Sequence, residues 1–203
     1  MKKLLTSLVT FVMLLAIPGF SSAEKSQQKD KSYDFSRIKS ATITTIKAQP
    51  YSEATYKADF DLAGKVNTAL KNALSGRNIK VGGATLGSLA KHSVNIAVSV
   101  EGLGVFTVHE DAYDETRTVD KKTVGKDENG KDVVVTVPTE EVVHHPAKDV
   151  PHAVAILNFR VTDSVTGKDI CSVRDSRERN DETDTSGMLG RICRDFAKTI
   201  SKN

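Results

Sequence analysis

Hydrophobic and polar positions along the chain change their spacing several times, and each spacing predicts a type of element. Alternation with a period of two predicts β-strands, because successive side chains of a strand point to opposite faces. The alternating or short apolar segments are Ala41–Ala48, Ile79–Val81, Ser93–Val108, Ala153–Thr162 and Asp169–Arg174. Gly102 and Gly104 interrupt the third of these segments, as a bulge or bend would.

Spacings of three and four residues predict two amphipathic helices. The first begins at Asp59 or Asp61 and ends at Gly76, where a left-handed glycine after the last turn is expected. The second begins near Asp184 or Thr185. Its predicted inner stripe consists of Leu189, Ile192, Cys193, Phe196, Ala197 and Ile200. A further two-turn helix is expected over Ala84–His92.

Residues 116–150 predict a hairpin inserted into the domain. Two β-prone arms, Thr116–Val124 and Asp132–Val143, flank an Asp-Glu-Asn-Gly turn that ends at Gly130. The first arm carries three adjacent charges, so it cannot be buried on both faces, and the hairpin is expected to protrude. The residues after it, 144–151, are expected to return irregularly, and Arg174–Glu182 is expected to form a solvated charged loop.

These elements indicate an α/β domain of the α+β kind. We expect a mixed sheet of about five to seven strands, with two main helices packed on it and a protruding β-hairpin. One domain, residues 33–203, would contain all of these elements, with the hairpin as its insertion.

The N-terminus indicates export. Lys2 and Lys3 precede a short apolar segment and a small-residue cleavage site ending at Ala23, so residues 1–23 are predicted to be a signal peptide. Residues 24–32 are polar and are predicted to be a flexible leader. No later segment is apolar enough to be a transmembrane span. The protein is expected to be periplasmic, associated with the cell surface, or secreted.

Charge adds to this picture. Removing Lys2 and Lys3 with the signal lowers the formal net charge from +3 to +1. A nearly neutral chain offers no electrostatic reason to bind nucleic acid.

Two cysteines, Cys171 and Cys193, permit two alternatives. In an oxidising compartment they could form a disulfide that joins the last helix to the sheet. They could equally be two buried free thiols.

Five histidines raise the question of a metal. A weak site would use His109, Glu110, His144 and His152, and would favour a metal-assisted hydrolase. Their spacing matches no known zinc pattern, and histidines in a surface loop are the simpler interpretation. No nucleophile motif is present, so neither an enzyme nor a cofactor is expected.

The Tyr33-Asp34-Phe35-Ser36 start, the single amphipathic helix, the Gly82-Gly83 pair and the segment from Ser93 to Val100 resemble a group of bacterial envelope proteins. The group includes domain-of-unknown-function lipoproteins with a similar start, the N-terminal domain of the Tol-system propeller protein and the curli secretion lipoprotein. The resemblance implies an assembly, secretion or partner-binding role. Residue 24 is Glu, so the lipidated cysteine of many members is missing.

The sequence therefore predicts a module that binds another envelope or surface protein, or a second copy of itself. A structural subunit of a surface assembly is the remaining alternative. Exposed strand edges pair readily with other chains, so the hairpin is the predicted contact surface. Its candidate partner-binding residues are Val119, Val124, Asn129, Gly130, Val133, Val135 and Val137.

Overall fold

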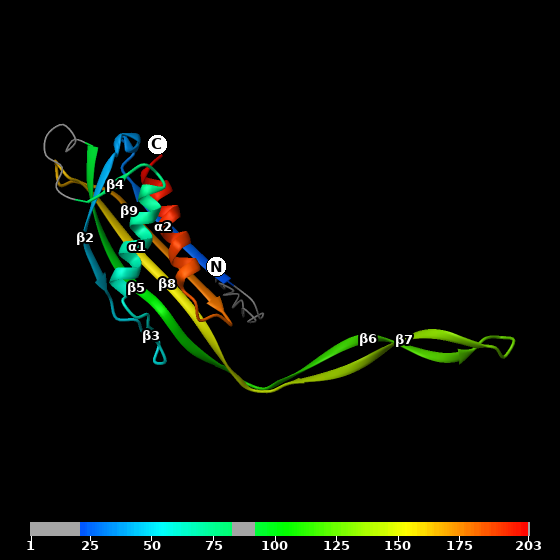
Figure 1. The fold of residues 1–203 in the computed structure, drawn as a ribbon. Coiled ribbons are helices and arrows are strands. Elements are labelled where there is room, and N and C mark those ends of the chain that lie inside the picture. Colours follow the sequence, from blue (N-terminus) through cyan, green and yellow to red (C-terminus); the bar gives the residue numbers. More distant parts are fainter. Residues whose placement is uncertain (1–20, 83–91, 203) are drawn as a thin grey trace, which may run out of the picture.

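A computed structural model describes residues 21–82 and 92–202, which form a mixed sheet covered by helices on one face (Figure 1). The sheet contains seven strands, and six of them follow the order β1-β9-β8-β5-β2-β4. These six strands are β1 (Ser21–Lys29), β9 (Asp169–Asn180), β8 (Lys148–Asp163), β5 (Ser93–Glu110), β2 (Ser40–Ala48) and β4 (Lys80–Val81).

The seventh strand, β3 (Lys57–Ala58), pairs with β5 outside this order. Strand β2 is parallel to both β4 and β5, and the other pairs are antiparallel. Strands β6 (Tyr113–Lys126) and β7 (Asp132–His145) form a separate two-stranded sheet. The predicted fold class, with its mixed sheet, two main helices and protruding hairpin, is confirmed.

Helices α1 (Leu62–Ser75) and α2 (Ser186–Ile200) lie side by side on one face of the sheet (Figure 1). The hydrophobic core fills the space between the helices and the sheet. All six residues of the predicted α2 stripe are buried, and the Phe196 ring stacks on Phe159 of β8 with centroids 4.1 Å apart. The opposite face of the sheet is largely polar, with residues such as Thr45, Ser99 and Asn158.

Asp61 begins α1, as one of the two predicted positions. Its carboxylate accepts a hydrogen bond from Gly64 N at 3.2 Å, which satisfies one free N–H of the first turn. The prediction of a left-handed Gly76 is wrong, because its φ is −63°. Turns that bond Arg77 and Asn78 back to the helix continue the right-handed path, and Asn78, at φ 59°, makes the left-handed reversal.

Strands β5 and β8 pair from Val94 to Glu110, with a bulge between Val100 and Gly102. The predicted interruption near Gly102 is therefore present as a bulge. The predicted irregular return over 144–151 is wrong, since β7 ends at His145 and β8 begins at Lys148. Proline is tolerated in β8 because Pro151 faces Thr107, whose carbonyl oxygen needs no N–H from β8: it accepts a hydrogen bond from the Thr55 hydroxyl at 3.0 Å, and the Thr107 N–H donates to the same hydroxyl at 2.8 Å.

Two segments predicted to be irregular are strands. Residues 24–32 were expected to form a flexible leader, but β1 extends to Lys29 and pairs along β9. The expected loop Arg174–Glu182 is also wrong, because β9 extends to Asn180. Strand β1 lies at an edge of the sheet and β9 lies next to it, and the two strands meet mainly through backbone hydrogen bonds. Such pairing requires few apolar side chains, so neither segment shows strong apolar alternation.

Part of the sequence lies beyond this description. The predicted signal peptide, apart from its last three residues, and the predicted short helix over Ala84–His92, apart from His92, lie outside the described residues. Within the described part, neither helix is long and apolar enough to cross a bilayer.

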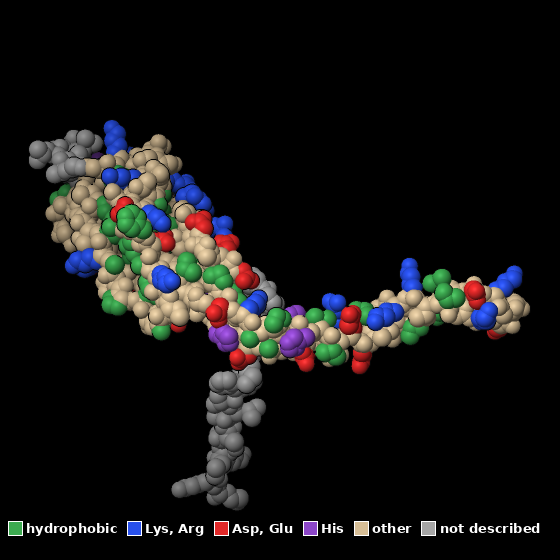
Figure 2. Space-filling view, turned by 60° about the horizontal axis from the view of Figure 1, so that its bottom comes forward, with side chains coloured by type: hydrophobic (Ala, Val, Ile, Leu, Met, Phe, Trp, Pro, Cys, Tyr) green, Lys and Arg blue, Asp and Glu red, His purple; other side chains and the backbone are tan. Residues whose placement is uncertain are grey.

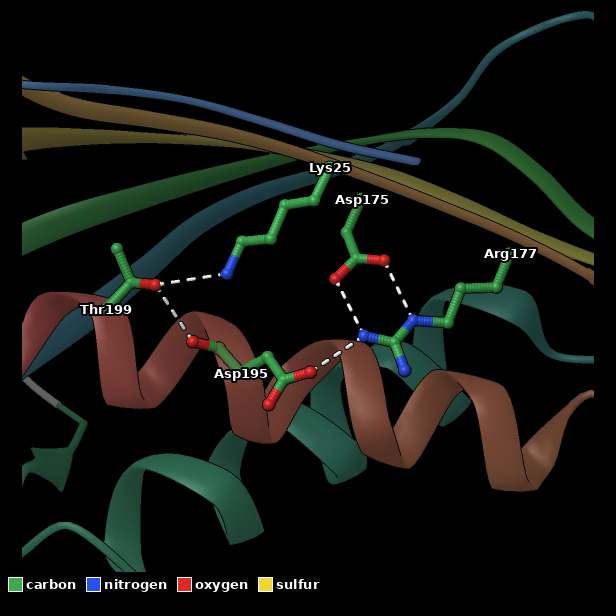
Figure 3. A network of polar contacts seen from close by, with 5 residues as sticks. All are labelled: Lys25, Asp175, Arg177, Asp195 and Thr199. Atoms are coloured by element: carbon green, nitrogen blue, oxygen red, sulfur yellow. Dashed lines mark hydrogen bonds and ion pairs between the residues drawn. The ribbon is translucent and has the colours of Figure 1, made fainter. Parts of the chain in front are cut away.

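A buried ionic network connects α2 to the sheet (Figure 3). Arg177 of β9 donates to both oxygens of Asp175 at 2.8 and 3.0 Å, and to Asp195 of α2 at 2.7 Å. Asp175 is 2% exposed. Lys25 of β1 and the backbone of α2 both contact the Thr199 hydroxyl, which extends the network to the sheet edge. This network explains why a charged stretch forms an ordered strand.

We predict that Asp175→Ala lowers the free energy of unfolding by about 3 kcal/mol, because it leaves the Arg177 guanidinium without its buried partner. Urea denaturation followed by circular dichroism measures this loss. Asp169→Ala is the matched control, since Asp169 pairs with Arg160 at the surface and its loss should leave stability near the wild-type value. Equal losses in the two variants would contradict the role assigned to the network.

Both cysteines are free thiols and are buried, Cys171 on β9 and Cys193 on α2. This arrangement corresponds to the second of the two predicted alternatives, and the disulfide stays a prediction that the experiment below tests. Burial raises the pKa of both thiols, that of Cys193 to about 12. Burial therefore disfavours the thiolate form that a nucleophilic cysteine requires.

We expect the folded protein, purified without reductant, to resist labelling by a thiol reagent at pH 8. Two equivalents of label should be taken up once urea unfolds the chain, because unfolding removes the burial that protects the thiols. Mass spectrometry of the alkylated protein counts the labels bound to each chain. Unfolded protein that takes up no label until a reductant is added would show a disulfide instead.

Candidate binding surface

The hairpin formed by β6 and β7, here called the arm (Tyr113–His145), projects from the body, which comprises the other described residues (Figure 1). Its two strands pair over 14 residues, from Tyr113 with His145 to Lys126 with Asp132. At ~3.3 Å per residue, the arm is ~46 Å long. It begins where β5 ends and finishes where β8 begins, so the longest strands of the body support it.

Local chemistry closes the tip of the arm. The Asp127 carboxylate accepts hydrogen bonds from the backbone N–H groups of Asn129 and Lys131, each at 2.9 Å. Gly130 adopts φ 77°, which glycine allows without steric cost. The predicted turn is present, and Asn129 and Gly130 act in it as turn-forming residues.

The register divides the predicted partner-binding valines between two faces. Val119, Val133, Val135 and Val137 lie on one face, where Thr123 faces Val135 and Lys121 faces Val137. Val124 lies on the other face opposite Val134. Val135 and Val137 are each 42% exposed, and on the opposite face Val124, Val134 and Val142 are 63–72% exposed. The first face therefore presents a contiguous row of apolar side chains to solvent, here called the valine face.

Both strands of the arm also present free backbone. In the part of the chain that the structure describes, β6 and β7 pair only with each other, so the outer edge of each strand is unpaired. Unpaired edges can accept another strand, whereas lysines along them, such as Lys122 and Lys126, limit uncontrolled pairing.

Histidines gather where the arm leaves the body (Figure 2). Each bonds a carboxylate on a neighbouring strand: His109 contacts Asp149 at 2.7 Å, His144 contacts Asp114 at 2.6 Å, and His145 contacts Glu115 at 3.0 Å. The hydrogen bond with Asp149 is the main cause that raises the pKa of His109. These cross-strand pairs strengthen the ribbon at its base.

The four residues of the hypothesised metal site do not come together as ligands. His109 and His144 are bound to separate carboxylates, His152 bonds Glu178 at 2.7 Å, and Glu110 lies 3.4 Å from Lys148. No group of three or more His, Cys, Asp or Glu side chains within residues 21–82 and 92–202 is arranged to hold a metal ion. The hypothesised four-residue metal site is therefore not assembled among the described residues.

An aromatic cluster, which the sequence analysis missed, supports the base of the arm. Tyr51 lies against Tyr56 and Phe106, with ring centroids 4.6 and 6.0 Å away, and Phe106 lies 5.1 Å from the His152 ring. The Tyr56 hydroxyl accepts a hydrogen bond from Leu103 N at 2.9 Å. The cluster fixes β5 and β8 just before they become the arm.

Two glycines make room for this cluster. A Cβ at Gly102 would lie 3.1 Å from the Tyr51 ring, and one at Gly104 would lie 2.1 Å from the Lys57 carbonyl oxygen. The spacing of these glycines by two residues places both on one face of β5. That spacing was the available signal that another segment approaches the strand closely.

No protein-family model matches the sequence, and no curated protein matches it either. Among solved structures, the chain is similar to the PelC dodecamer from Paraburkholderia phytofirmans in two crystal forms, at 10% identity and with TM-scores of 0.48 and 0.47. Each match covers 90% of this chain and 99% of the PelC chain.

A PDZ domain protein from Parabacteroides distasonis ATCC 8503 is similar at 11% identity with a TM-score of 0.33, over 87% of this chain and 35% of that protein. Likeness at this distance supports no inference about function, which has to come from the arm and the body themselves.

Because the arm contributes no residue to the core, we expect the body to fold without it. Replacing Thr116–Val143 by Asn-Gly should leave the free energy of unfolding near the wild-type value, as measured by urea denaturation. Gly104→Val is the contrasting variant, since its side chain would collide with β3, and it should be clearly destabilised. A shortened chain that fails to unfold cooperatively would show that the arm is part of the domain.

Proposed function

We propose that the protein is an exported binding module that acts through protein–protein contacts rather than catalysis, and that the arm is its contact surface. One observation carries the proposal: 33 residues extend away from the body without covering any part of its core. Ordering such a segment costs conformational entropy, and no core packing among the described residues offsets that cost. A bound partner would offset it.

The surface chemistry of the arm supports a protein partner. Solvent-exposed valines on a two-stranded ribbon form an apolar strip, and contiguous exposed apolar surface is typical of interaction sites. The free strand edges add backbone N–H and C=O groups that a β-strand of the partner can pair with. The predicted signal peptide places this contact in the envelope or outside the cell.

The deciding experiment is affinity capture from crosslinked host cells, using the chain that begins at Glu24 and the shortened chain lacking Thr116–Val143. We expect a partner that the intact chain captures and the shortened, folded chain loses. Equal capture by both would place the contact on the body and overturn the assignment to the arm.

Valine substitutions on the two faces refine the test. We expect Val133→Ser with Val135→Ser and Val137→Ser to reduce capture strongly, because they remove the apolar row of the valine face. The matched control changes the same number of valines on the opposite face: Val124→Ser, Val134→Ser and Val142→Ser. The control should retain capture, whereas a greater loss in the control would assign the contact to the other face.

A further inference from the structure

Charge is divided unevenly along the hairpin ribbon. Its proximal segment, residues 109–117 and 139–149, contains seven acidic and two basic side chains, a formal net charge of −5 with histidines neutral. Its distal segment, residues 118–138, contains four acidic and four basic side chains. The excess of acids is therefore confined to the part of the ribbon next to the body. Six of the seven acids lie within 4 Å of a histidine, lysine or arginine nitrogen of the same ribbon, and Glu140 has no such ion pair among the described residues.

The helix layer of the body, formed by α1 and α2, has the opposite charge. The two helices contain five basic side chains and one acidic one, a net charge of +4. The single acid, Asp195, is bound by Arg177, and Lys65 is paired with Asp59 at 3.0 Å. The other four cations are exposed and have no ion-pair partner among the described residues: Lys71, Arg191, Arg194 and Lys198.

A groove runs between these helices. Its volume is about 610 Å³, and it is lined largely by small side chains, including Gly64, Ala69 and Gly190, with Lys65 and Arg194 also on its wall. Small side chains leave room for another backbone to approach. The wall also contains Asp61, and Lys65 is paired with Asp59, so Arg194 is the cation of the groove that has no ion pair among the described residues. Together with Lys71, Arg191 and Lys198 on the same helices, it favours an anionic occupant.

We propose that the proximal segment of one copy docks on the helix layer of a second copy of this chain. The inference rests on the proposed function and assigns a partner to the base of the arm; the valine face, which lies in the distal segment, is not part of this contact. The arm runs away from its own body, and its strands pair only with each other, so its own helix layer does not receive it (Figure 1). Both surfaces, the acidic proximal segment and the cationic helix layer, belong to the same chain. A second copy of this chain is therefore the partner that we assign to the helix layer.

This contact joins two different surfaces, so a bound pair of copies leaves one arm and one helix layer free. Head-to-tail association of this kind continues into a ring or a filament. Helix α1 is ~21 Å long and covers less than half of the arm. Because the contact relies on exposed charges, we expect association to be concentration-dependent and sensitive to salt.

A charge-swap experiment tests the proposal by sedimentation velocity over a concentration series. The arm variant combines Asp111→Lys, Glu140→Lys and Glu141→Lys, and the helix variant combines Lys71→Glu, Arg191→Glu and Arg194→Glu. Each alone should self-associate at least ~10-fold more weakly than the wild-type chain, because like charges then face each other. Mixed together they should associate again, since each arm meets a helix layer of opposite charge.

The matched control places the same charge change outside the helices: Lys39→Glu, Lys47→Glu and Lys80→Glu, which should associate like the wild type. Variants that associate like the wild type, or a mixture that does not recover, would overturn the proposal. A wild-type chain that stays monomeric while its arm still captures another protein would overturn it too, yet would leave the proposed function intact. Circular dichroism confirms that each variant is folded.

Discussion

The antiparallel pairing of β5 with β8 is the constraint on which the rest of the structure depends. It spans the body from Val94 to Glu110, and its two strands then continue into the arm. Within the body this pair is buried under the helices on one face, where Ile96, Leu157 and Phe159 are fully enclosed. Beyond the body the same backbone pairing persists without a core. The ribbon can project because its hydrogen bonds are satisfied internally between the two strands.

Support at the junction explains how a solvent-exposed ribbon can keep a direction. The aromatic cluster around Tyr51 and Phe106 packs on the last part of the pair, and Gly102 and Gly104 let it approach the backbone. The histidine–carboxylate pairs begin where this cluster ends. The junction therefore combines a packed base with cross-strand polar contacts, and the surface beyond it is left for contact with a partner.

The two faces of the body differ in a way that matches the proposed assembly. One sheet face is polar and open, whereas the other is covered by helices whose outer surface is cationic. The proximal segment of the ribbon is anionic, and the distal segment is neutral and bears valines. Attraction between the proximal segment and a second body would leave the valine face near the tip available for further contacts. Electrostatic attraction would then set the register of docking, while apolar contact would add affinity.

The periodicity of the sequence was sufficient for the elements that have one buried face. Strands β2, β5 and β8 and helices α1 and α2 were predicted because burial imposes a period of 2 or 3.6 on apolar side chains. The hairpin was predicted from its Asn-Gly turn, and its valines from alternation. Strand β1, the second half of β9 and the start of β8 were missed, since polar strands are held mainly by partners distant in sequence and bear little local signal.

By itself, the sequence determined the fold class, the amphipathic faces and the existence of an exposed hairpin, all of which are local consequences of residue order. Only the tertiary structure decided which valines share a face of the arm and which carboxylates the histidines bond. It also decided that Arg177 donates hydrogen bonds to both Asp175 and Asp195. It also decided that the acidic segment lies apart from the cationic helices of its own chain. These features depend on strand register and on contacts between residues up to 40 positions apart in the sequence, and neither leaves a periodic mark in it.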